Sequence, residues 1–227
     1  MKVIGHRGWP TRYPDNVIEG IAAAFEVAEM VEVDIRVSGD GHLVLSHDPV
    51  LGGLLVAKSS WQALSEVELA GGFQPVRLED LLEIFPASPF NLEVKNSPGE
   101  PGFDPDHDIA CRVAALARAG DLLSCFNWPA MDAVRPEFPG VATGLLADVG
   151  WDVAGAVDHA LASGHVAVIP HWELALSSGP SCQVADAAGL TVAVWTLNDP
   201  SRLDELASIG VTAIITDNPG EMRRVIG

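Results

Sequence analysis

The sequence predicts an α/β protein built as a single (β/α)8 TIM barrel, and three observations support this fold class. Eight short apolar segments of strand character recur along the chain, and alanine- and leucine-rich segments of helical periodicity lie between them. Several strand segments are continuous apolar runs, which is typical of a parallel sheet covered by helices. The length of 227 residues suits one domain at the lower end of the size range of this barrel. An open doubly wound sheet is the alternative, although no GxGxxG turn follows the first strand.

The same patterns place each element in order. The expected strands are Lys2–Gly5, Val31–Arg36, Phe90–Val94, Leu122–Cys125, Val141–Leu146, His165–Ile169, Thr191–Trp195 and Thr212–Ile215. The expected helices are Asn16–Ala28, Leu78–Ile84, Asp108–Ala119, Val153–Ala162, Ser181–Ala188 and Pro200–Ser208.

One connection is too long for a single crossover of a barrel. Between Arg36 and Phe90 the chain first returns through the hairpin-like segment Gly41–Ser46, and a loop rich in small residues follows. Insertions after barrel strands lie at the carboxyl-terminal face, where active sites are built. We therefore interpret residues 48–76 as a short insertion after the second strand that covers part of the site. The whole chain, 1–227, is expected to be one domain.

Composition limits the partners of the protein. The formal net charge is −18, from 31 acidic and 13 basic side chains, so the surface repels nucleic acid and anionic membranes. We expect a small-molecule substrate and no stable membrane insertion, and a homo-oligomer is compatible with this composition. No signal-peptide pattern or membrane-spanning segment is found, which predicts a cytoplasmic protein. Cys111, Cys125 and Cys182 lack metal-type spacing and are expected to be small buried residues in a reducing compartment.

The segment from Val31 to Asp48 carries the strongest chemical signal. Its apolar strand is interrupted by Glu32 and Asp34, which point to the same face because side chains of a strand alternate. Two carboxylates on one buried face repel each other and lose hydration, so they need protons or a cation. A hard divalent metal ion is the simplest answer. The segment ends, after a turn at Asp40-Gly41, on His47.

Other polar residues gather where the predicted strands end. His6 and Arg7 follow the first strand, and Glu93 and Lys95 share one face at the end of the third. In a barrel the carboxyl ends of all strands meet at one mouth, so residues far apart in the sequence converge there. Cations at such a mouth can neutralise negative charge, and two histidines, whose unperturbed pKa lies near neutrality, can transfer protons.

These motifs, taken in order, resemble those of the glycerophosphodiester phosphodiesterase family. The resemblance covers most of the chain, and it rests on His6-Arg7-Gly8, Tyr13-Pro14-Asp15-Asn16, Glu32-Val33-Asp34, Asp40-Gly41, His47-Asp48, Asn91-Leu92-Glu93-Val94-Lys95, Trp195-Thr196-Leu197-Asn198 and Thr216-Asp217-Asn218-Pro219. Each motif alone is weak, but the ordered set at strand ends is specific.

The resemblance implies hydrolysis of glycerophosphodiesters to glycerol 3-phosphate and an alcohol, a reaction of glycerol and lipid metabolism. By similarity, a divalent metal ion, Mg²⁺ or Ca²⁺, would bind the three carboxylates. The implied roles are metal ligation by Glu32, Asp34 and Glu93, acid–base catalysis by His6 and His47, and phosphate contact by Arg7 and Lys95.

Several residues carry a second interpretation. Trp195 and His171 are expected to line the substrate pocket, although core packing and an ordinary rim position compete with that role. Asp48 fits a metal-site partner and a turn residue equally well. Asp217 is interpreted as turn and helix-cap chemistry, and Asn16 as a helix N-cap. The family usually has Glu where this chain has Asp15, so the contacts of that carboxylate are expected to shift.

The remaining candidates are assigned structural roles. His42, His107, His159 and His165 are expected to be ordinary surface or loop residues, and Cys125 a packing residue. Two other functions stay open. One is a phospholipase D-like enzyme that forms a cyclic phosphate through attack by a substrate hydroxyl instead of water, and the other is a non-catalytic barrel that binds a phosphorylated ligand.

Overall fold

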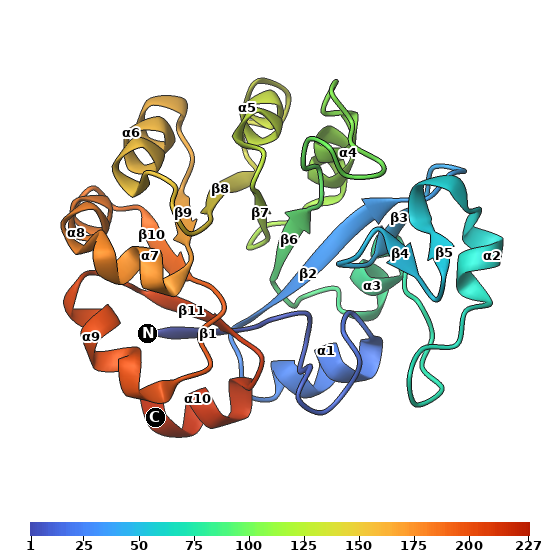
Figure 1. Cartoon of the computed structure of the whole chain (residues 1–227), viewed down its shortest axis with the longest axis horizontal. Helices are drawn as coiled ribbons and strands as arrows, with labels where there is room; N and C mark the ends of the chain where they lie inside the picture. Colours follow the sequence, from blue (N-terminus) through green and yellow to red (C-terminus); the bar gives the residue numbers. More distant parts are fainter.

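Eight parallel strands close into a barrel in the computed structural model, which describes residues 1–227. Around the ring the strands are β1 (Lys2–Gly5), β2 (Met30–Val37), β6 (Phe90–Val94), β7 (Leu122–Cys125), β8 (Ala142–Ala147), β9 (Ala167–Pro170), β10 (Thr191–Val194) and β11 (Ala213–Thr216). The ring closes because β1 pairs in parallel with both β2 and β11. The predicted barrel is confirmed (Figure 1).

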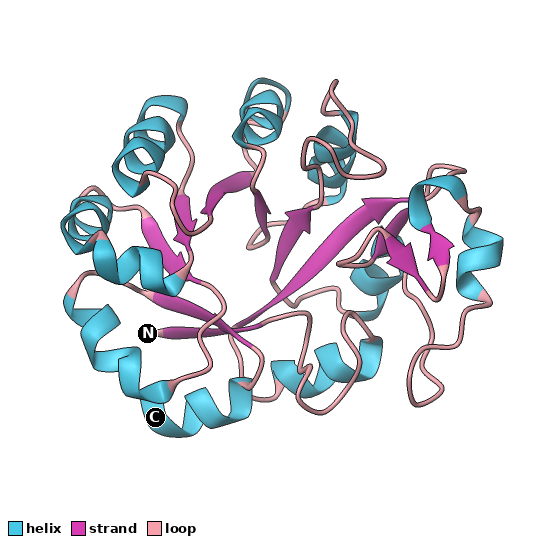
Figure 2. Cartoon of the chain, viewed as in Figure 1, coloured by secondary structure: helices cyan, strands magenta, loops and turns pink.

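Helices form the outer layer of the barrel (Figure 2). They are α1 (Ile18–Phe25), α3 (Leu78–Ile84), α4 (Asp108–Leu116), α5 (Trp128–Glu137), α6 (Val153–Ser163), α7 (Trp172–Ser177), α8 (Gly179–Ala187), the 3₁₀ turn η2 (Pro200–Arg202), α9 (Leu203–Ser208) and α10 (Pro219–Ile226). Helices α5, α7 and α10 are not predicted from the sequence. Two of these helices contain proline, and α7 has only six residues, so their patterns are weak. No helix is long and apolar enough to cross a membrane.

The interior of the barrel is divided into an apolar half and a polar half. Toward the amino ends of the strands, small side chains such as Ala142, Ala167, Ala193 and Ala213 surround a cavity of about 410 Å³. Toward the carboxyl ends, charged residues replace them. A larger apolar core of 44 buried residues lies between the strands and the helices. The fold is therefore held mainly from outside the ring, which leaves its mouth free for polar groups.

The predicted insertion has a small hydrophobic cluster of its own. After β2 the chain returns as β3 (Leu43–Leu45), which is antiparallel to β2. The insertion then contains β4 (Val50–Leu51), β5 (Leu54–Leu55), η1 (Val56–Lys58) and α2 (Trp61–Ser65). Val44, Val56 and Leu64 are buried together beneath these elements. Figure 1 shows the insertion at the edge of the barrel beside β3.

An ion pair with a buried carboxylate fastens the amino-terminal end of the barrel. The Asp121 carboxylate accepts hydrogen bonds from the Phe90 backbone N–H at 2.9 Å and from the Arg118 backbone N–H at 2.9 Å. The Arg118 guanidinium donates to Asp121 and to the carbonyls of Phe85 and Ser88. One aspartate thus ties β6 to the turn before β7.

We predict that Asp121→Ala lowers the free energy of unfolding by about 3 kcal/mol, because it leaves a partly buried guanidinium and two backbone donors unpaired. Urea denaturation measures this loss. Asp158→Ala, at an exposed position of α6, is the control and should change stability by less than about 0.5 kcal/mol. Equal effects in the two variants would contradict the prediction.

Candidate active site

Three carboxylates converge inside the mouth of the barrel. Glu32 and Asp34 of β2 are each 1% exposed, and Glu93 of β6 is 8% exposed. Asp34 and Glu93 are register partners on neighbouring strands. An oxygen from each of the three carboxylates lies within 4.8 Å of the others. The alternation predicted from the sequence therefore holds, and the two carboxylates of β2 point inward.

Burial and crowding give Glu32 and Asp34 opposite pKa shifts. Burial, and after it repulsion from Asp34 and Glu93, raises the pKa of Glu32 well above its ordinary value. Burial also acts to raise the pKa of Asp34, but the charges of Lys95 and Arg7 outweigh it and hold that pKa below its ordinary value. The charged form is therefore favoured for Asp34 and disfavoured for Glu32.

Two cationic side chains border the carboxylates. The Lys95 ammonium lies 2.7 Å from Glu93 Oε1 and 3.5 Å from Asp34 Oδ1. Arg7 Nε lies 3.2 Å from Asp34 Oδ2. Burial acts to lower the pKa of Lys95, but its carboxylate neighbours reverse the effect and raise it above the ordinary value. Both cations are therefore charged at neutral pH, and both contact the carboxylates directly.

The turn after β1 aims its backbone into the site. Arg7 and Gly8 have φ angles of +53° and +97°. A side chain at Gly8 would meet the backbone of Gly20 at 2.8 Å, so glycine is required there. The turn directs the Arg7 backbone N–H to Glu32 Oε2 at 2.9 Å. The sequence His6-Arg7-Gly8 thus positions both a side chain and a backbone donor.

The segment after this turn corrects one prediction. Asn16 does not cap the first helix, whose N-cap is Val17. Instead, the Asn16 amide donates to Asp34 Oδ2 at 3.0 Å and accepts from the Asp34 backbone N–H at 3.1 Å. Asp15, where the family usually has Glu, accepts from Arg7 Nη1 at 2.8 Å. Both residues orient charged groups of the site.

His6 is oriented by Asp217, a residue that is predicted from the sequence to belong to a turn. The His6 Nδ1 atom lies 2.6 Å from Asp217 Oδ1, and the Asn198 amide donates to Asp217 Oδ2 at 2.6 Å. His6 Nε2 then faces Glu32 Oε2 at 3.9 Å. Burial acts to raise the pKa of Asp217, but bonding to His6 outweighs it and lowers that pKa. Asp217 is therefore an ionised partner of His6, and the turn-and-cap interpretation was incomplete because residue 217 is distant in sequence from residue 6.

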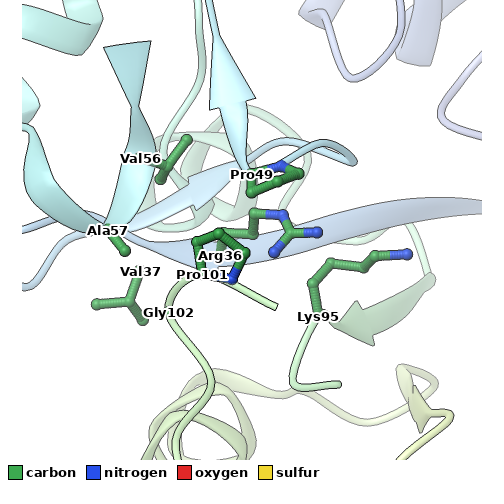
Figure 3. A pocket seen from close by; sticks show the side chains of 8 residues that line it. All are labelled: Arg36, Val37, Pro49, Val56, Ala57, Lys95, Pro101 and Gly102. Atoms are coloured by element: carbon green, nitrogen blue, oxygen red, sulfur yellow. The ribbon is translucent and has the colours of Figure 1, made fainter. Parts of the chain in front are cut away.

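His47 lies at the outer rim, at the start of the insertion. Its Nδ1 atom lies 2.8 Å from Asp48 Oδ1, so Asp48 pairs with the histidine. The His47 carbonyl accepts two hydrogen bonds from buried Arg36, and Arg36 also donates to Glu100 at 2.8 Å. Figure 3 shows Arg36 and Lys95 side by side, with their charged ends directed to the same side. Arg36 was missed because a single arginine at the end of a strand has no distinctive pattern.

Aromatic rings form one wall of the mouth. The rings of Trp195 and His171 meet edge to face with centroids 5.2 Å apart, and Trp195 contacts Phe126 in the same manner at 5.2 Å. Lys95 Nζ lies 6.0 Å from the centre of the Phe126 ring. The Trp195 indole N–H is occupied by the Ile169 carbonyl. Trp195 therefore offers an apolar ring face and no free donor, and Phe126 links this wall to Lys95.

The structure thus gathers His6, Arg7, Glu32, Asp34, Glu93 and Lys95 in one contact network. Cys125 is buried and its pKa is raised by burial to about 12, which agrees with a packing role.

Comparison with known proteins identifies the family. A model of the glycerophosphoryl diester phosphodiesterase family matches residues 6–221. The chain belongs to this family. A glycerophosphodiester phosphodiesterase of Caldanaerobacter subterraneus subsp. tengcongensis is 25% identical over 238 residues, which are 96% of this chain and 94% of that relative.

Two solved structures have the same fold as this family member. The glycerophosphodiester phosphodiesterase of Thermotoga maritima matches with a TM-score of 0.81 at 24% identity, over 99% of this chain and 98% of that one. A phosphodiesterase of Oleispira antarctica, solved in complex with the product sn-glycerol-3-phosphate, matches with a TM-score of 0.83 at 22% identity, over 100% of this chain and 96% of that one.

The donor set of this family member fits a hard cation. Glu32 Oε1 is buried and has no hydrogen-bond partner, and the same is true of Asp34 Oδ1. Buried oxygens without donors are costly unless a proton or a cation satisfies them. All three potential ligands are carboxylates, which Mg²⁺ and Ca²⁺ prefer. The residues present are therefore compatible with an oxygen-ligated divalent ion.

We predict that Glu32→Gln stabilises the metal-free protein at pH 7.5 by about 1–3 kcal/mol, because it removes a buried charge that two other carboxylates repel. The pKa of Glu32 is higher in the folded protein than its ordinary value near 4.5. The protonated form of Glu32 therefore stabilises the folded protein fully below that value, and this contribution is lost as the pH rises through the raised pKa.

Urea denaturation in EDTA between pH 5 and 8 measures this difference. The gap between Glu32→Gln and wild type should widen toward high pH. Glu19→Gln, at an exposed position of α1, is the matched control and should follow the wild-type curve. A Glu32→Gln variant that is less stable than wild type at pH 7.5 would contradict the prediction.

Proposed function

We propose that the protein hydrolyses glycerophosphodiesters to glycerol 3-phosphate and an alcohol, with a divalent metal ion held by Glu32, Asp34 and Glu93. The observation that carries the proposal is the cluster of three buried carboxylates with oxygens within 4.8 Å of one another, beside His6 and two cations. Membership of the phosphodiesterase family supports the reaction class.

Binding of the substrate uses the positive groups of the mouth. Arg7 and Lys95 would contact the phosphate, and both already face the carboxylate cluster. When bound, Mg²⁺ or Ca²⁺ would supply further positive charge to phosphoryl oxygens. Trp195 and His171 would pack against the carbon atoms of the substrate at the aromatic wall. A cavity of about 180 Å³ beside His47 and Asp15, lined in part by Leu51 and Leu69 of the insertion, offers space for the alcohol.

Proton transfer is assigned to the two histidines. In hydrolysis the attacking water loses a proton to one imidazole, a bond forms from its oxygen to phosphorus, and the bond from phosphorus to the alcohol oxygen breaks. The other imidazole gives its proton to that departing oxygen. His6 presents Nε2 to the site because Asp217 holds Nδ1, and His47 is held by Asp48 and by Arg36.

The proposal is tested by release of glycerol 3-phosphate from glycerophosphocholine with added Mg²⁺ or Ca²⁺. Phosphorus NMR of the products separates an open phosphomonoester, which we expect, from a cyclic phosphate. A cyclic product would show that a hydroxyl of the substrate, and not water, is the nucleophile. Folded protein that cleaves no glycerophosphodiester with either ion would refute the proposal, and phosphate-ester binding without turnover would favour a non-catalytic barrel.

His6→Ala is expected to reduce kcat by about 10²–10⁴-fold or more, because one of the two proton transfers loses its group. Metal affinity should stay within a few-fold of wild type, since His6 lies outside the carboxylate cluster. Calorimetric titration with Ca²⁺ measures the affinity, and Glu32→Ala is the contrast that should lose it. A His6→Ala enzyme with normal turnover would show that the role is misassigned.

Asp217→Asn is expected to lower kcat roughly 100-fold with little change in KM, because the amide holds the His6 ring less firmly and no longer supports its positive charge. Asp217→Glu, which keeps the charge, should recover part of the rate. If Asp217 had only a structural role, both variants would lower the melting temperature, and kcat would not differ between the amide and the carboxylate variant.

A further inference from the structure

A second group of potential metal ligands lies outside the barrel, in the helix layer. Asp132 belongs to α5, His159 to α6, and His165 to the turn between α6 and β9. Figure 1 shows α5 and α6 as neighbours on the outer surface. His159 and His165 are predicted to be ordinary surface or loop histidines; His165 does lie in a loop, but it is buried, at 3% exposure.

The three side chains point their potential donor atoms at one place. His159 Nε2 lies 2.9 Å and His165 Nε2 lies 3.0 Å from the same oxygen, Asp132 Oδ1. All donor atoms lie within 4.8 Å of one another. The two imidazole rings are stacked, with centroids 5.8 Å apart and an angle of 14° between their planes. Two parallel histidines thus present the same nitrogen to one carboxylate.

The surroundings hold His165 in place. Its Nδ1 atom lies 2.7 Å from the hydroxyl of Thr143, a fully buried residue of β8. A partner on one ring nitrogen fixes the orientation of the other, as is common for histidines that ligate metals. The other side of the group is open, since the side chains of His159 and Asp132 are about one-third exposed. The ring of Trp128 lies beside His159 at 5.6 Å. The group is therefore rigid at its base and accessible at its rim.

We propose that Asp132, His159 and His165 bind one Zn²⁺ ion, at a site separate from the carboxylates of the barrel mouth. Two imidazole nitrogens and one carboxylate oxygen suit zinc, which takes nitrogen and oxygen ligands in tetrahedral geometry. Mg²⁺ and Ca²⁺ prefer all-oxygen sites such as the mouth. Water supplies the fourth ligand from the open side. The overall charge of −18 favours uptake of a cation.

Small shifts suffice for the ion to enter. Ligands of a tetrahedral zinc ion are about 3.3 Å apart, for metal–ligand bonds near 2.05 Å. The present distances of 2.9 and 3.0 Å from Asp132 must therefore open by a few tenths of an ångström. The Asp132 side chain is about one-third exposed and can make that shift. His165 needs its lone pair on Nε2, so its proton moves to Nδ1, where the Thr143 oxygen accepts it.

One charged neighbour, Arg135, and the burial of His165 influence the affinity. The charge of Arg135 disfavours a second positive charge near His165. Its Nη1 atom donates hydrogen bonds to the carbonyls of Pro139 and Val141, which hold the guanidinium in place. Burial, opposed by bonding to Asp132, lowers the pKa of His165, so this ring is neutral at pH 7 and ready to ligate. Bound zinc would join α5, α6 and the start of β9. Its expected effect is on stability, since it lies outside the barrel.

Zinc binding to the tag-free, metal-stripped protein tests the proposal by equilibrium dialysis, with excess Mg²⁺ present to occupy the mouth. Wild type should bind one equivalent and gain about 5–10 °C in melting temperature at a 100-fold excess of free zinc over Kd. His159→Ala should lose this equivalent or bind it at least about tenfold more weakly. Glu32→Ala, which removes a ligand of the mouth, should retain it, as should the control His42→Ala.

If His159→Ala folds poorly, Asp132→Asn serves as a second variant. It should also lose the zinc-induced shift in melting temperature. Titration with Co²⁺ gives an independent readout, because a four-coordinate site produces visible absorption bands that both variants should lack. The proposal is overturned if wild type binds no zinc at micromolar concentrations. It is equally overturned if the bound zinc disappears in Glu32→Ala and persists in His159→Ala, which would assign the ion to the mouth.

Discussion

Repulsion among Glu32, Asp34 and Glu93 is the constraint on which the rest of the site depends. Carboxylates less than 5 Å apart repel one another by about 3–4 kcal/mol per pair at an effective dielectric constant of 20. The charges of Arg7 and Lys95 offset part of this repulsion, and burial, together with the remainder, raises the pKa of Glu32. One buried oxygen of Glu32 still has no donor. The cluster thus keeps an unsatisfied buried oxygen that a divalent ion would relieve.

The periodicity of the sequence was sufficient for the barrel and for half of the site. Strand alternation predicted that Glu32 and Asp34 share a face, and it placed β1, β6 and β7 with the bounds that the structure has. Helices with weak patterns, such as α5 and α7, were missed. The reason is physical, since packing against the barrel stabilises them more than their own residue preferences do.

Contacts between residues distant in sequence could not be predicted in the same way. Asp217 was assigned to a turn, yet it holds His6, which lies 211 positions away. Asn16 looked like a helix cap, yet it clamps Asp34. His165 was predicted to be a surface or loop residue, and it does lie in a loop, yet its side chain is buried against Thr143. In each case the residue type suits both roles, and only the closure of the ring decides between them.

The central claim is that the three carboxylates hold a divalent ion on which hydrolysis depends. Its most direct test is the phosphodiesterase activity of EDTA-stripped protein during titration with Mg²⁺ or Ca²⁺, measured together with the amount of metal bound. Activity should be absent at the start and should rise in proportion to occupancy, reaching its maximum near one equivalent at the mouth. Full activity of the stripped protein, unchanged by either ion, would contradict the account.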